Sequence, residues 1–516
     1  MAWDEAGLMR ALDLLPQRFK GPGGVAGVVH NGQVIARRAW GHADMGARLV
    51  MRTATRLPIC SISKQFTCGL LLDQVADPAS LDPFVADYLP QVTGEMPKVQ
   101  HLADNQSGLR DYWALTVLQG AFPEQEFRRS DALPLIARTK TGHFAPGVSY
   151  SYCNNNFRIL GELIERAAGR DLGGLLQERI FGPAGMATAA LLPDSRHNAD
   201  GVVGYEGNDG TGFLPALNGI WWAGDAGISA SLDDMLAWEV FIDRTRGDRD
   251  GLYNRLTALP LFRDGAGASY GNGIAHAEVA GRATTGHGGA LRGFRAHRRH
   301  MANERLSVVV MFNHEADAHG AAIGLIEAAL GYVATEAAAP PEGWAGLWLD
   351  EADGMIARTV PEDGGVTLHY TTTPTRLKVG VDGLARATEL VLERTSEGLT
   401  MRRDGENRVV TARPLAPMDR VDPAIAGRYW SDELEAWMEI GTGDGAAWVG
   451  FEGMLGRGPV ERMYPVAKDV WVIPTRRSMD ASPPGDWTML VRREGGQVIG
   501  LTLGCWLARG IAYTRV

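Results

Sequence analysis

The chain has 516 residues, of which 45% are hydrophobic and 22% are charged, as in ordinary globular proteins. A chain of this length is too long for one hydrophobic core, so it predicts two or three domains. The net charge of -10 and the pI near 5.7 argue against a nucleic acid partner, because its phosphates would be repelled.

The chain shows no targeting or metal-binding pattern. The first eight residues have no basic region and no apolar core of a signal peptide, and no apolar run long enough to span a membrane follows. We therefore expect a cytoplasmic protein without a membrane partner. Cys60, Cys68, Cys153 and Cys505 form no C-x-x-C pair, and the histidines lack zinc-ligand spacing. We predict buried thiols and neither a metal nor a cofactor.

The first predicted element is a β-hairpin. Residues 25–40 alternate between apolar and polar side chains around His30-Asn31-Gly32, a favourable two-residue turn. The hairpin places an antiparallel sheet at the start of the chain.

The segment Ser61-Ile62-Ser63-Lys64 comes next, at the start of an apolar helix. Ser61 and Lys64 share one helix face, so an unprotonated Lys64 could take the serine proton. Only six of the 51 basic residues are lysines, and arginine cannot act as a base. A solvated Ser/Lys pair at the end of a helix would have the same sequence, so this motif indicates catalysis only together with other motifs.

A second polar motif follows a turn in residues 144–154. Tyr152-Cys153-Asn154 precedes an amphipathic stretch that begins at Phe157. A phenol near a lysine ammonium can have its pKa lowered and act as a general base or acid, and an asparagine amide can both donate to and accept from a bound peptide. The alternative is that Tyr152 is a packed aromatic residue with a satisfied hydroxyl group.

Residues 283–298 and 305–313 predict further strands, and 317–333 predict a closing helix. The first of these segments contains His287-Gly288-Gly289, whose glycines permit close approach of another backbone. A histidine flanked by glycines is also common in turns. These elements suit an α+β sheet in which the two ends of the domain come together.

The three motifs, in this order, resemble the serine β-lactamase and penicillin-binding protein superfamily, whose signature is S-x-x-K, then Y-x-N, then K/H-[TSG]-G. The resemblance covers roughly residues 5–332. It includes 101–109, similar to H-L-L-x-H-T-S-G-L, and 224–235, similar to G-x-G-G-L-x-S-T-x-x-D-M. It implies a catalytic domain over residues 1–334, an antiparallel sheet flanked by helices.

The composition changes near Ala337, where small residues and proline predict a linker over 335–343. Short alternating segments divided by Asp-Gly and Gly-Gly turns follow, a pattern typical of small antiparallel β-barrels. A weak repeat relates residues 345–351 to 426–433. We therefore predict two β-barrel domains, 344–417 and 418–516.

A catalytic domain of this kind followed by two barrels resembles the bacterial D-aminopeptidase family over essentially the whole chain. The resemblance implies a serine hydrolase that releases small N-terminal D-amino acids, such as D-Ala, from peptides, amides and esters through an acyl-enzyme. It also implies a homodimer. His287 stands where many superfamily members have a lysine, and a mostly neutral histidine captures a substrate carboxylate less well.

The resemblance also assigns roles to the motif residues. It implies that Ser61 is the nucleophile, Lys64 its general base and Tyr152 the proton shuttle to the leaving amine. The backbone N–H groups of Ser61 and Ala290, which follows Gly289, would form the oxyanion hole.

Substrate binding is implied for three further positions. Asn154 and His287 would position the substrate and the tyrosine. In D-aminopeptidases a loop of the last domain enters the cleft, and here residues 476–486 match it, with Asp480 facing the substrate ammonium. A solvated hairpin tip is the alternative interpretation of this loop.

Two other classes of function share part of this pattern. A promiscuous esterase, a class C-like β-lactamase or a D,D-carboxypeptidase would share every N-terminal motif but would not need the acidic loop. A non-catalytic penicillin-recognising protein would have little reason to retain Ser61, Lys64 and Tyr152 together.

Overall fold

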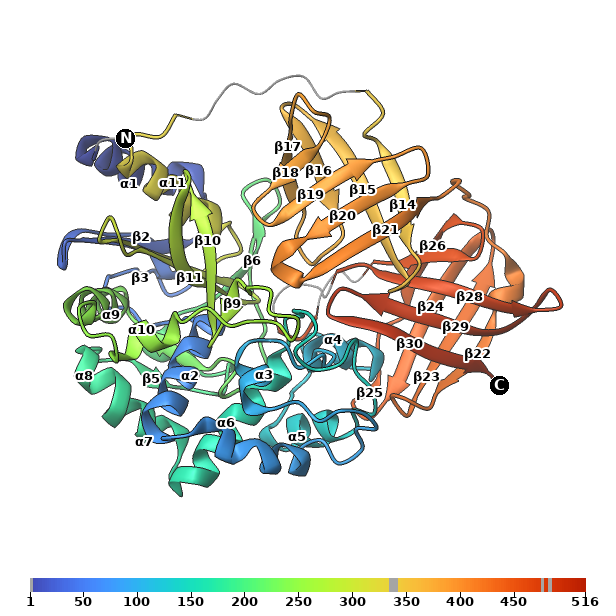
Figure 1. The fold of residues 1–516 in the computed structure, drawn as a ribbon, viewed down its shortest axis with the longest axis horizontal. Coiled ribbons are helices and arrows are strands. Elements are labelled where there is room, and N and C mark those ends of the chain that lie inside the picture. Colours follow the sequence, from blue (N-terminus) through green and yellow to red (C-terminus); the bar gives the residue numbers. More distant parts are fainter. Residues whose placement is uncertain (1–2, 334–341, 475–477, 481–484) are drawn as a thin grey trace.

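The computed structural model describes residues 3–333, 342–474, 478–480 and 485–516. An N-terminal domain of sheet and helices lies beside two β-barrels, which also contact each other (Figure 1). Of the predicted linker 335–343, only residues 342 and 343 are among those described.

An eight-stranded antiparallel sheet organises the N-terminal domain, in the order β3-β2-β1-β13-β12-β11-β10-β9. The predicted hairpin is confirmed as β1 (Gly23–His30) and β2 (Gln33–Asp44). Asn31 and Gly32, with φ of 52° and 75°, have the two positive values that a type I′ turn requires.

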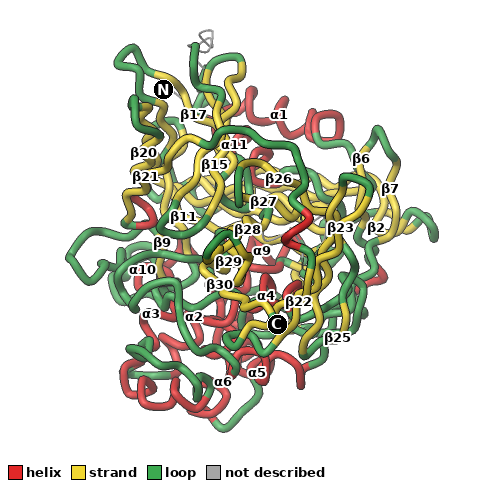
Figure 2. The backbone as a smooth tube through the Cα atoms, turned by 90° about the vertical axis from the view of Figure 1, so that its right-hand side faces the viewer, coloured by secondary structure: helices red, strands yellow, loops and turns green. Residues whose placement is uncertain are grey.

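The two ends of this domain meet in the sheet, because β13 (Leu306–Phe312) pairs with both β1 and β12 (Phe294–Met301). α1 (Glu5–Arg18) and the predicted closing helix, α11 (Ala318–Ala329), bury their apolar sides against one face. Helices including α2, α3, α5 and α6 lie on the other side (Figure 2). This second side carries the larger core, in which the site described below is embedded.

The other helices of the N-terminal domain are α2 (Ser63–Gln74), α3 (Val99–Ala103), α4 (Tyr112–Leu118), α5 (Arg129–Ala137), α6 (Asn154–Ala168), α7 (Leu172–Leu176), α8 (Gly182–Ala184), α9 (Leu232–Thr245) and α10 (Leu252–Leu256). Its other strands are β3 (Leu49–Val50), β4 (Leu57–Pro58), β5 (Ala190–Leu191), β6 (Tyr205–Asn208), β7 (Gly212–Pro215), β8 (Ile228–Ala230), β9 (Tyr270–Gly271), β10 (Ile274–Val279) and β11 (Arg282–Leu291).

The first barrel is closed by pairing of its first and last strands. Its alternating residues face a core of their own, as the sequence pattern predicts. The strands are β14 (Gly346–Asp350), β15 (Met355–Glu362), β16 (Gly365–His369), β17 (Thr375–Val379), β18 (Ala385–Ala387), β19 (Leu390–Arg394), β20 (Leu399–Arg403) and β21 (Arg408–Pro414).

The second barrel closes through β23 and β24, with β25 added as a short hairpin strand. The weak sequence repeat is explained, since β14 and β22 are the first strands of the two barrels. The strands are β22 (Gly427–Ser431), β23 (Ala436–Gly443), β24 (Ala446–Gly453), β25 (Gly456–Arg457), β26 (Glu461–Ala467), β27 (Val470–Ile473), β28 (Trp487–Glu494), β29 (Gln497–Cys505) and β30 (Ala508–Arg515).

Apolar contacts join the second barrel to the N-terminal domain in both directions. Leu115 and Leu118 of α4 belong to the core of this barrel. Met479, which follows β27, is 1% exposed and belongs to the core of the N-terminal domain. Because each domain completes the other's core, we expect them to behave as one body.

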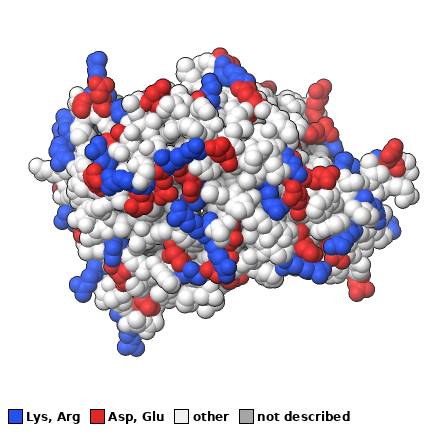
Figure 3. All heavy atoms as spheres, turned by 90° about the horizontal axis from the view of Figure 1, so that it is seen from below, with Lys and Arg blue, Asp and Glu red and all other residues white. Residues whose placement is uncertain are grey.

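One face of the molecule is mixed in charge (Figure 3). Acidic and basic side chains are interspersed over the face seen in Figure 3. Across the described residues, no helix is both long and apolar enough to cross a membrane.

Candidate active site

Ser61 lies in a short 3₁₀ turn, η1 (Cys60–Ile62), which runs directly into α2. The preceding residue, Cys60, has a φ of 52°, a left-handed conformation that is uncommon outside glycine. Strand β11 packs closely on this turn, since a Cβ atom at Gly289 would come within 2.2 Å of the Ile59 carbonyl oxygen. The absent side chain therefore lets β11 approach the serine.

The Lys64 ammonium is completely buried and has three hydrogen-bond partners. Its Nζ lies 3.0 Å from Ser61 Oγ, 2.8 Å from Asn154 Oδ1 and 2.7 Å from the backbone carbonyl of Asp225. Burial lowers the pKa of Lys64 to about 8, although the charges of Asp225 and Asp111 raise it.

This arrangement suits a neutral lysine that accepts the serine proton. A neutral amine has two N–H donors, which Asn154 Oδ1 and the Asp225 carbonyl can take up. The remaining lone pair then faces Ser61 Oγ. The geometry therefore permits Lys64 to act as a general base near pH 8.

Tyr152 approaches the serine from another side, with its hydroxyl group 2.8 Å from Ser61 Oγ. The predicted lowering of its pKa is wrong. Burial raises the pKa of Tyr152 well above its usual value. The negative charges of Asp111, Asp225 and Asp480 add to the effect of burial, and the hydrogen bond to Ser61 opposes it. Tyr152 is therefore a neutral phenol and a proton donor in the resting site.

His287 stands in β11, within hydrogen-bonding distance of two oxygens. Its Nδ1 lies 2.5 Å from the Gly288 carbonyl oxygen, which can only accept, so Nδ1 carries the proton. Its Nε2 then accepts from the Tyr270 hydroxyl at 3.0 Å. Burial lowers the pKa of His287 to about 3, and the charge of Lys64 acts in the same direction. The ring is neutral at pH 7, as the sequence predicts.

Asp111 is a buried residue that the sequence analysis missed. Its Oδ2 accepts hydrogen bonds from the backbone N and the Nδ2 of Asn154, at 2.6 and 2.8 Å. Its Oδ1 caps α4 by accepting from the backbone N–H groups of Trp113 and Ala114. The carboxylate orients the Asn154 amide so that its oxygen faces Lys64. A local signal exists, since aspartate before a helix is a common N-cap.

A cavity of about 670 Å³ opens above Ser61 and is lined by all three domains. Tyr152, Asn154, His287, Gly289, Ala290 and Asp480 all line it, together with Ser61, so the structure brings these predicted residues together. The N-terminal domain adds Trp113 and Trp222, the first barrel adds Thr372 and Thr373, and the second adds Trp506 and Leu507. The sequence analysis missed these six, because no local motif marks them.

Asp480 reaches the cavity from the second barrel. Of the predicted loop 476–486, residues 478–480, 485 and 486 are described and the others lie outside the described residues. The Ser478 hydroxyl donates to Asp480 Oδ1 at 2.8 Å, and the amide of Arg292 donates to the Asp480 carbonyl oxygen at 2.9 Å. Both contacts orient Asp480, and the carboxylate places negative charge in the cavity wall.

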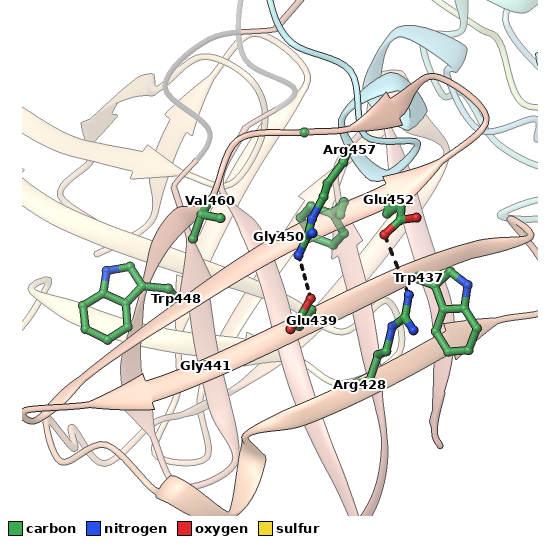
Figure 4. Close-up of a pocket in the computed structure, with 11 residues that line it drawn as sticks. Arg428, Trp437, Glu439, Gly441, Trp448, Gly450, Glu452, Arg457 and Val460 are labelled. Atoms are coloured by element: carbon green, nitrogen blue, oxygen red, sulfur yellow. Dashed lines mark hydrogen bonds and ion pairs between the residues drawn. The ribbon is translucent and has the colours of Figure 1, made fainter.

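Another hollow, of about 210 Å³, lies on the outer face of the second barrel. Figure 4 shows Trp437 and Trp448 at its two ends, with Arg–Glu pairs between them. Arg457 lies 3.0 Å from Glu439, and Arg428 pairs with a second glutamate. Among the described residues that line this hollow there is no serine, threonine or cysteine, and thus no hydroxyl or thiol nucleophile of these types.

The cysteines and acidic residues do not suggest other chemistry. All four cysteines are free and buried, as predicted. Within the part of the chain that is described, no group of three or more His, Cys, Asp and Glu side chains could hold a metal ion.

Comparisons with known proteins agree with this geometry. Residues 11–331 match the family profile described as Beta-lactamase, and residues 337–514 match the one described as D-aminopeptidase, domain B. A D-aminopeptidase of Cereibacter sphaeroides is 60% identical over 517 residues, which cover 100% of both chains. A D-aminopeptidase of Brucella melitensis is 48% identical over 507 residues, 97% of each chain.

Solved structures share the fold at much lower sequence identity. A penicillin-binding protein homologue from Pyrococcus abyssi has a TM-score of 0.54 at 16% identity, over 88% of this chain and 99% of its own. A D-stereospecific amidohydrolase from Streptomyces sp. has a TM-score of 0.51 at 21% identity, over 64% of this chain and 100% of its own. The full-length similarity therefore shows that this chain belongs to the D-aminopeptidase family of the serine β-lactamase and penicillin-binding protein superfamily.

Proposed function

We propose that the protein is a serine hydrolase that releases small N-terminal D-amino acids, such as D-Ala, from peptides, amides and esters. One observation carries the chemistry: Ser61 Oγ lies 3.0 Å from Lys64 Nζ and 2.8 Å from the Tyr152 hydroxyl. The nucleophile thus contacts both a buried amine and a phenol. The names of the full-length relatives support the choice of substrate.

Acylation begins when Ser61 Oγ attacks the scissile carbonyl carbon and its proton passes to the neutral amine of Lys64. The C–N bond then breaks, and the leaving amine takes a proton from the Tyr152 hydroxyl. The ammonium proton of Lys64 restores the phenol, so the proton count balances. Water later cleaves the Ser61 ester, and the serine hydroxyl is regenerated.

The developing oxyanion needs N–H donors beside Ser61. The amides of Ser61 and Ala290 are the proposed pair, and the close packing of Gly289 on the serine turn supports this. Neutral His287 adds no positive charge there, in contrast to a lysine. A substrate carboxylate near the reacting carbonyl is therefore not favoured.

Amine recognition is assigned to Asp480. Its carboxylate lines the same cavity as Ser61, where a partly desolvated anion favours an ammonium group. An aminopeptidase requires this charge, whereas an esterase or a β-lactamase does not. Asp480 therefore favours the proposed activity over those alternatives.

The test is hydrolysis of D-Ala-p-nitroanilide, its L-enantiomer and a chromogenic cephalosporin by the full chain. We expect the D-anilide to be hydrolysed fastest and a mass adduct to form on Ser61. Equal rates on the two enantiomers, or a preference for the cephalosporin, would overturn the assignment. Light scattering of the same preparation tests the proposed homodimer.

A further inference from the structure

Besides lining the cavity with Thr372 and Thr373, the first barrel contacts a residue of the second barrel that lines the same cavity. Trp506 lies in the turn between β29 and β30, and its side chain lines the cavity that contains Ser61. The same residue packs against the hydrophobic core of the first barrel. One indole ring therefore belongs both to the cavity wall and to the interface between the two barrels.

The position of this ring is set by Glu406, a first-barrel residue that is 5% exposed. The indole Nε1 of Trp506 donates a hydrogen bond to Glu406 Oε1 at 2.9 Å. Burial opposes ionisation of Glu406, but Arg403, Arg509 and Arg408 together hold its pKa below the ordinary value. The indole N–H thus meets a charged acceptor, which makes the hydrogen bond stronger than a neutral one.

Glu406 also contacts the catalytic segment of the N-terminal domain. Its backbone carbonyl accepts hydrogen bonds from the Ser149 hydroxyl and, at 3.3 Å, from the amide of Tyr150. Tyr150 precedes Tyr152 by two residues, and its ring lies 6.4 Å from that of Trp506. Glu406 therefore contacts both the wall of the cavity and the strand-like segment that delivers the proton donor.

The other side of the same turn is held by the N-terminal domain. The carbonyl oxygen of Leu507 accepts a hydrogen bond of 3.0 Å from the amide of Asp111, the residue that orients Asn154. The turn Trp506–Leu507 is thus fixed to the N-terminal domain on one side and to the first barrel on the other. A side chain held in this way has little freedom to adapt to a substrate.

We propose that Trp506 is a specificity-determining residue of this cavity and that Glu406 is the positioning residue that holds its indole ring there. The proposal rests on the proposed function, in that Ser61 must react with substrates bound in this cavity. It gives the first barrel a role in substrate selection beyond that of the two threonines with which it lines the cavity.

The test compares four single variants of the full chain. Trp506→Phe removes the indole N–H and keeps an aromatic ring, and Glu406→Ala removes the acceptor. Glu406→Gln removes the charge and keeps an acceptor oxygen. Trp430→Phe is the matched control, because the Trp430 indole donates to Asp432 Oδ1 at 2.8 Å and does not line the cavity.

We expect Trp506→Phe and Glu406→Ala each to raise KM for D-Ala-p-nitroanilide by about threefold to tenfold, the effect of one lost hydrogen bond. Their kcat for the anilide should change less than their KM, and kcat/KM for p-nitrophenyl acetate should fall less than kcat/KM for the anilide. Glu406→Gln, which keeps an acceptor oxygen but loses the charge, should raise KM less than Glu406→Ala does, and Trp430→Phe should keep the wild-type KM. The double variant Trp506→Phe/Glu406→Ala should be no worse than either single variant, because both remove the same contact.

Three results would overturn the proposal. They are additive effects on KM in the double variant, an unchanged KM in Trp506→Phe, and equal losses of kcat/KM on D-Ala-p-nitroanilide and p-nitrophenyl acetate. Melting temperatures identify a merely structural role, in which Tm falls while KM is unchanged. Glu406→Ala removes the ion-pair partner of Arg403, whereas Arg408 keeps Asp353. Trp506→Phe therefore decides the question if Glu406→Ala does not fold. If the proposed function is wrong, the wild-type protein will not prefer D-Ala-p-nitroanilide. The inference about Trp506 is tested separately, by the ratio of KM between each variant and wild type.

Discussion

The backbone carbonyl of Asp480 accepts a hydrogen bond of 2.9 Å from the amide of Arg292. Arg292 lies in the turn between β11 and β12, so a segment of the second barrel is fastened to the hairpin that carries Ala290. This hydrogen bond therefore fixes the position of the proposed ammonium-binding carboxylate, Asp480, relative to the proposed oxyanion donor, the amide of Ala290. Movement of the barrel would displace both relative to the substrate.

Replacement of Asp480 tests amine recognition. Asp480→Asn keeps the size of the side chain and removes its charge. The lost attraction for an ammonium is on the order of 1 to 3 kcal/mol, which predicts a fall of about tenfold to a hundredfold in kcat/KM for D-Ala-p-nitroanilide. N-acetylated and simple ester substrates, which lack the ammonium, are the control and should be spared. An equal loss of kcat/KM on substrates with and without the ammonium would mean that Asp480 does not bind the amine.

The pH dependence of acylation tests Lys64. The proposed base is the neutral amine, and burial lowers the pKa of Lys64 to about 8. Activity should therefore rise as the pH increases towards about 8 and level off above it. Lys64→Arg should be inactive at every pH, because arginine keeps its proton. Single-turnover rates between pH 6 and 10 measure this, and a rate that is flat across pH 8 would contradict it.

Asp111 should affect every substrate alike, in contrast to Asp480. Asp111→Asn replaces a carboxylate that accepts from Asn154, so the amide that faces Lys64 loses its orientation. We expect kcat to fall for anilide and ester substrates together, by about tenfold, as for the loss of a buried charged hydrogen bond. Removal of the negative charge also moves the limb of the pH profile to lower pH, since Asp111 raises the pKa of Lys64 against the larger effect of burial. A loss confined to substrates with an ammonium would exclude this role.

The close approach of β11 to the serine turn can be tested at Gly289. A methyl group there would lie 2.2 Å from the Ile59 carbonyl oxygen and push the strand away from Ser61. If Ala290 supplies an oxyanion donor, Gly289→Ala should lower kcat by about a hundredfold to a thousandfold on all substrates. Gly441→Ala is the control, because no atom lies within 4 Å of the added Cβ atom. A near-wild-type kcat in Gly289→Ala would remove the strand from the mechanism.

The sequence alone predicted the parts of the site that are local in the chain. Ser61 and Lys64 are one helical turn apart, and Tyr152 and Asn154 are separated by a single residue. Both motifs can therefore be recognised in the sequence without knowledge of the fold. The barrels were also predictable, since alternation and turn residues are short-range signals.

The walls of the cavity depend on domain packing, which no local pattern reports. Trp506 and Thr372 come from different barrels and meet only in the folded molecule. The predicted direction of the Tyr152 pKa shift was wrong for the same reason. The proximity of Lys64 was predictable, but the depth of burial and the nearby charges of Asp111 and Asp225 are properties of the packed core.

The order of the cavity residues along the chain has a consequence for synthesis. Domains generally fold as they leave the ribosome, from the N-terminus onward. Ser61, Lys64 and Tyr152 emerge long before Asp480 and Trp506, but Met479, which completes the core around the proposed nucleophile, emerges with the last barrel. We therefore expect the site to reach its final packing only when the whole chain has been made, so that the proposed nucleophile and the walls of its cavity mature together.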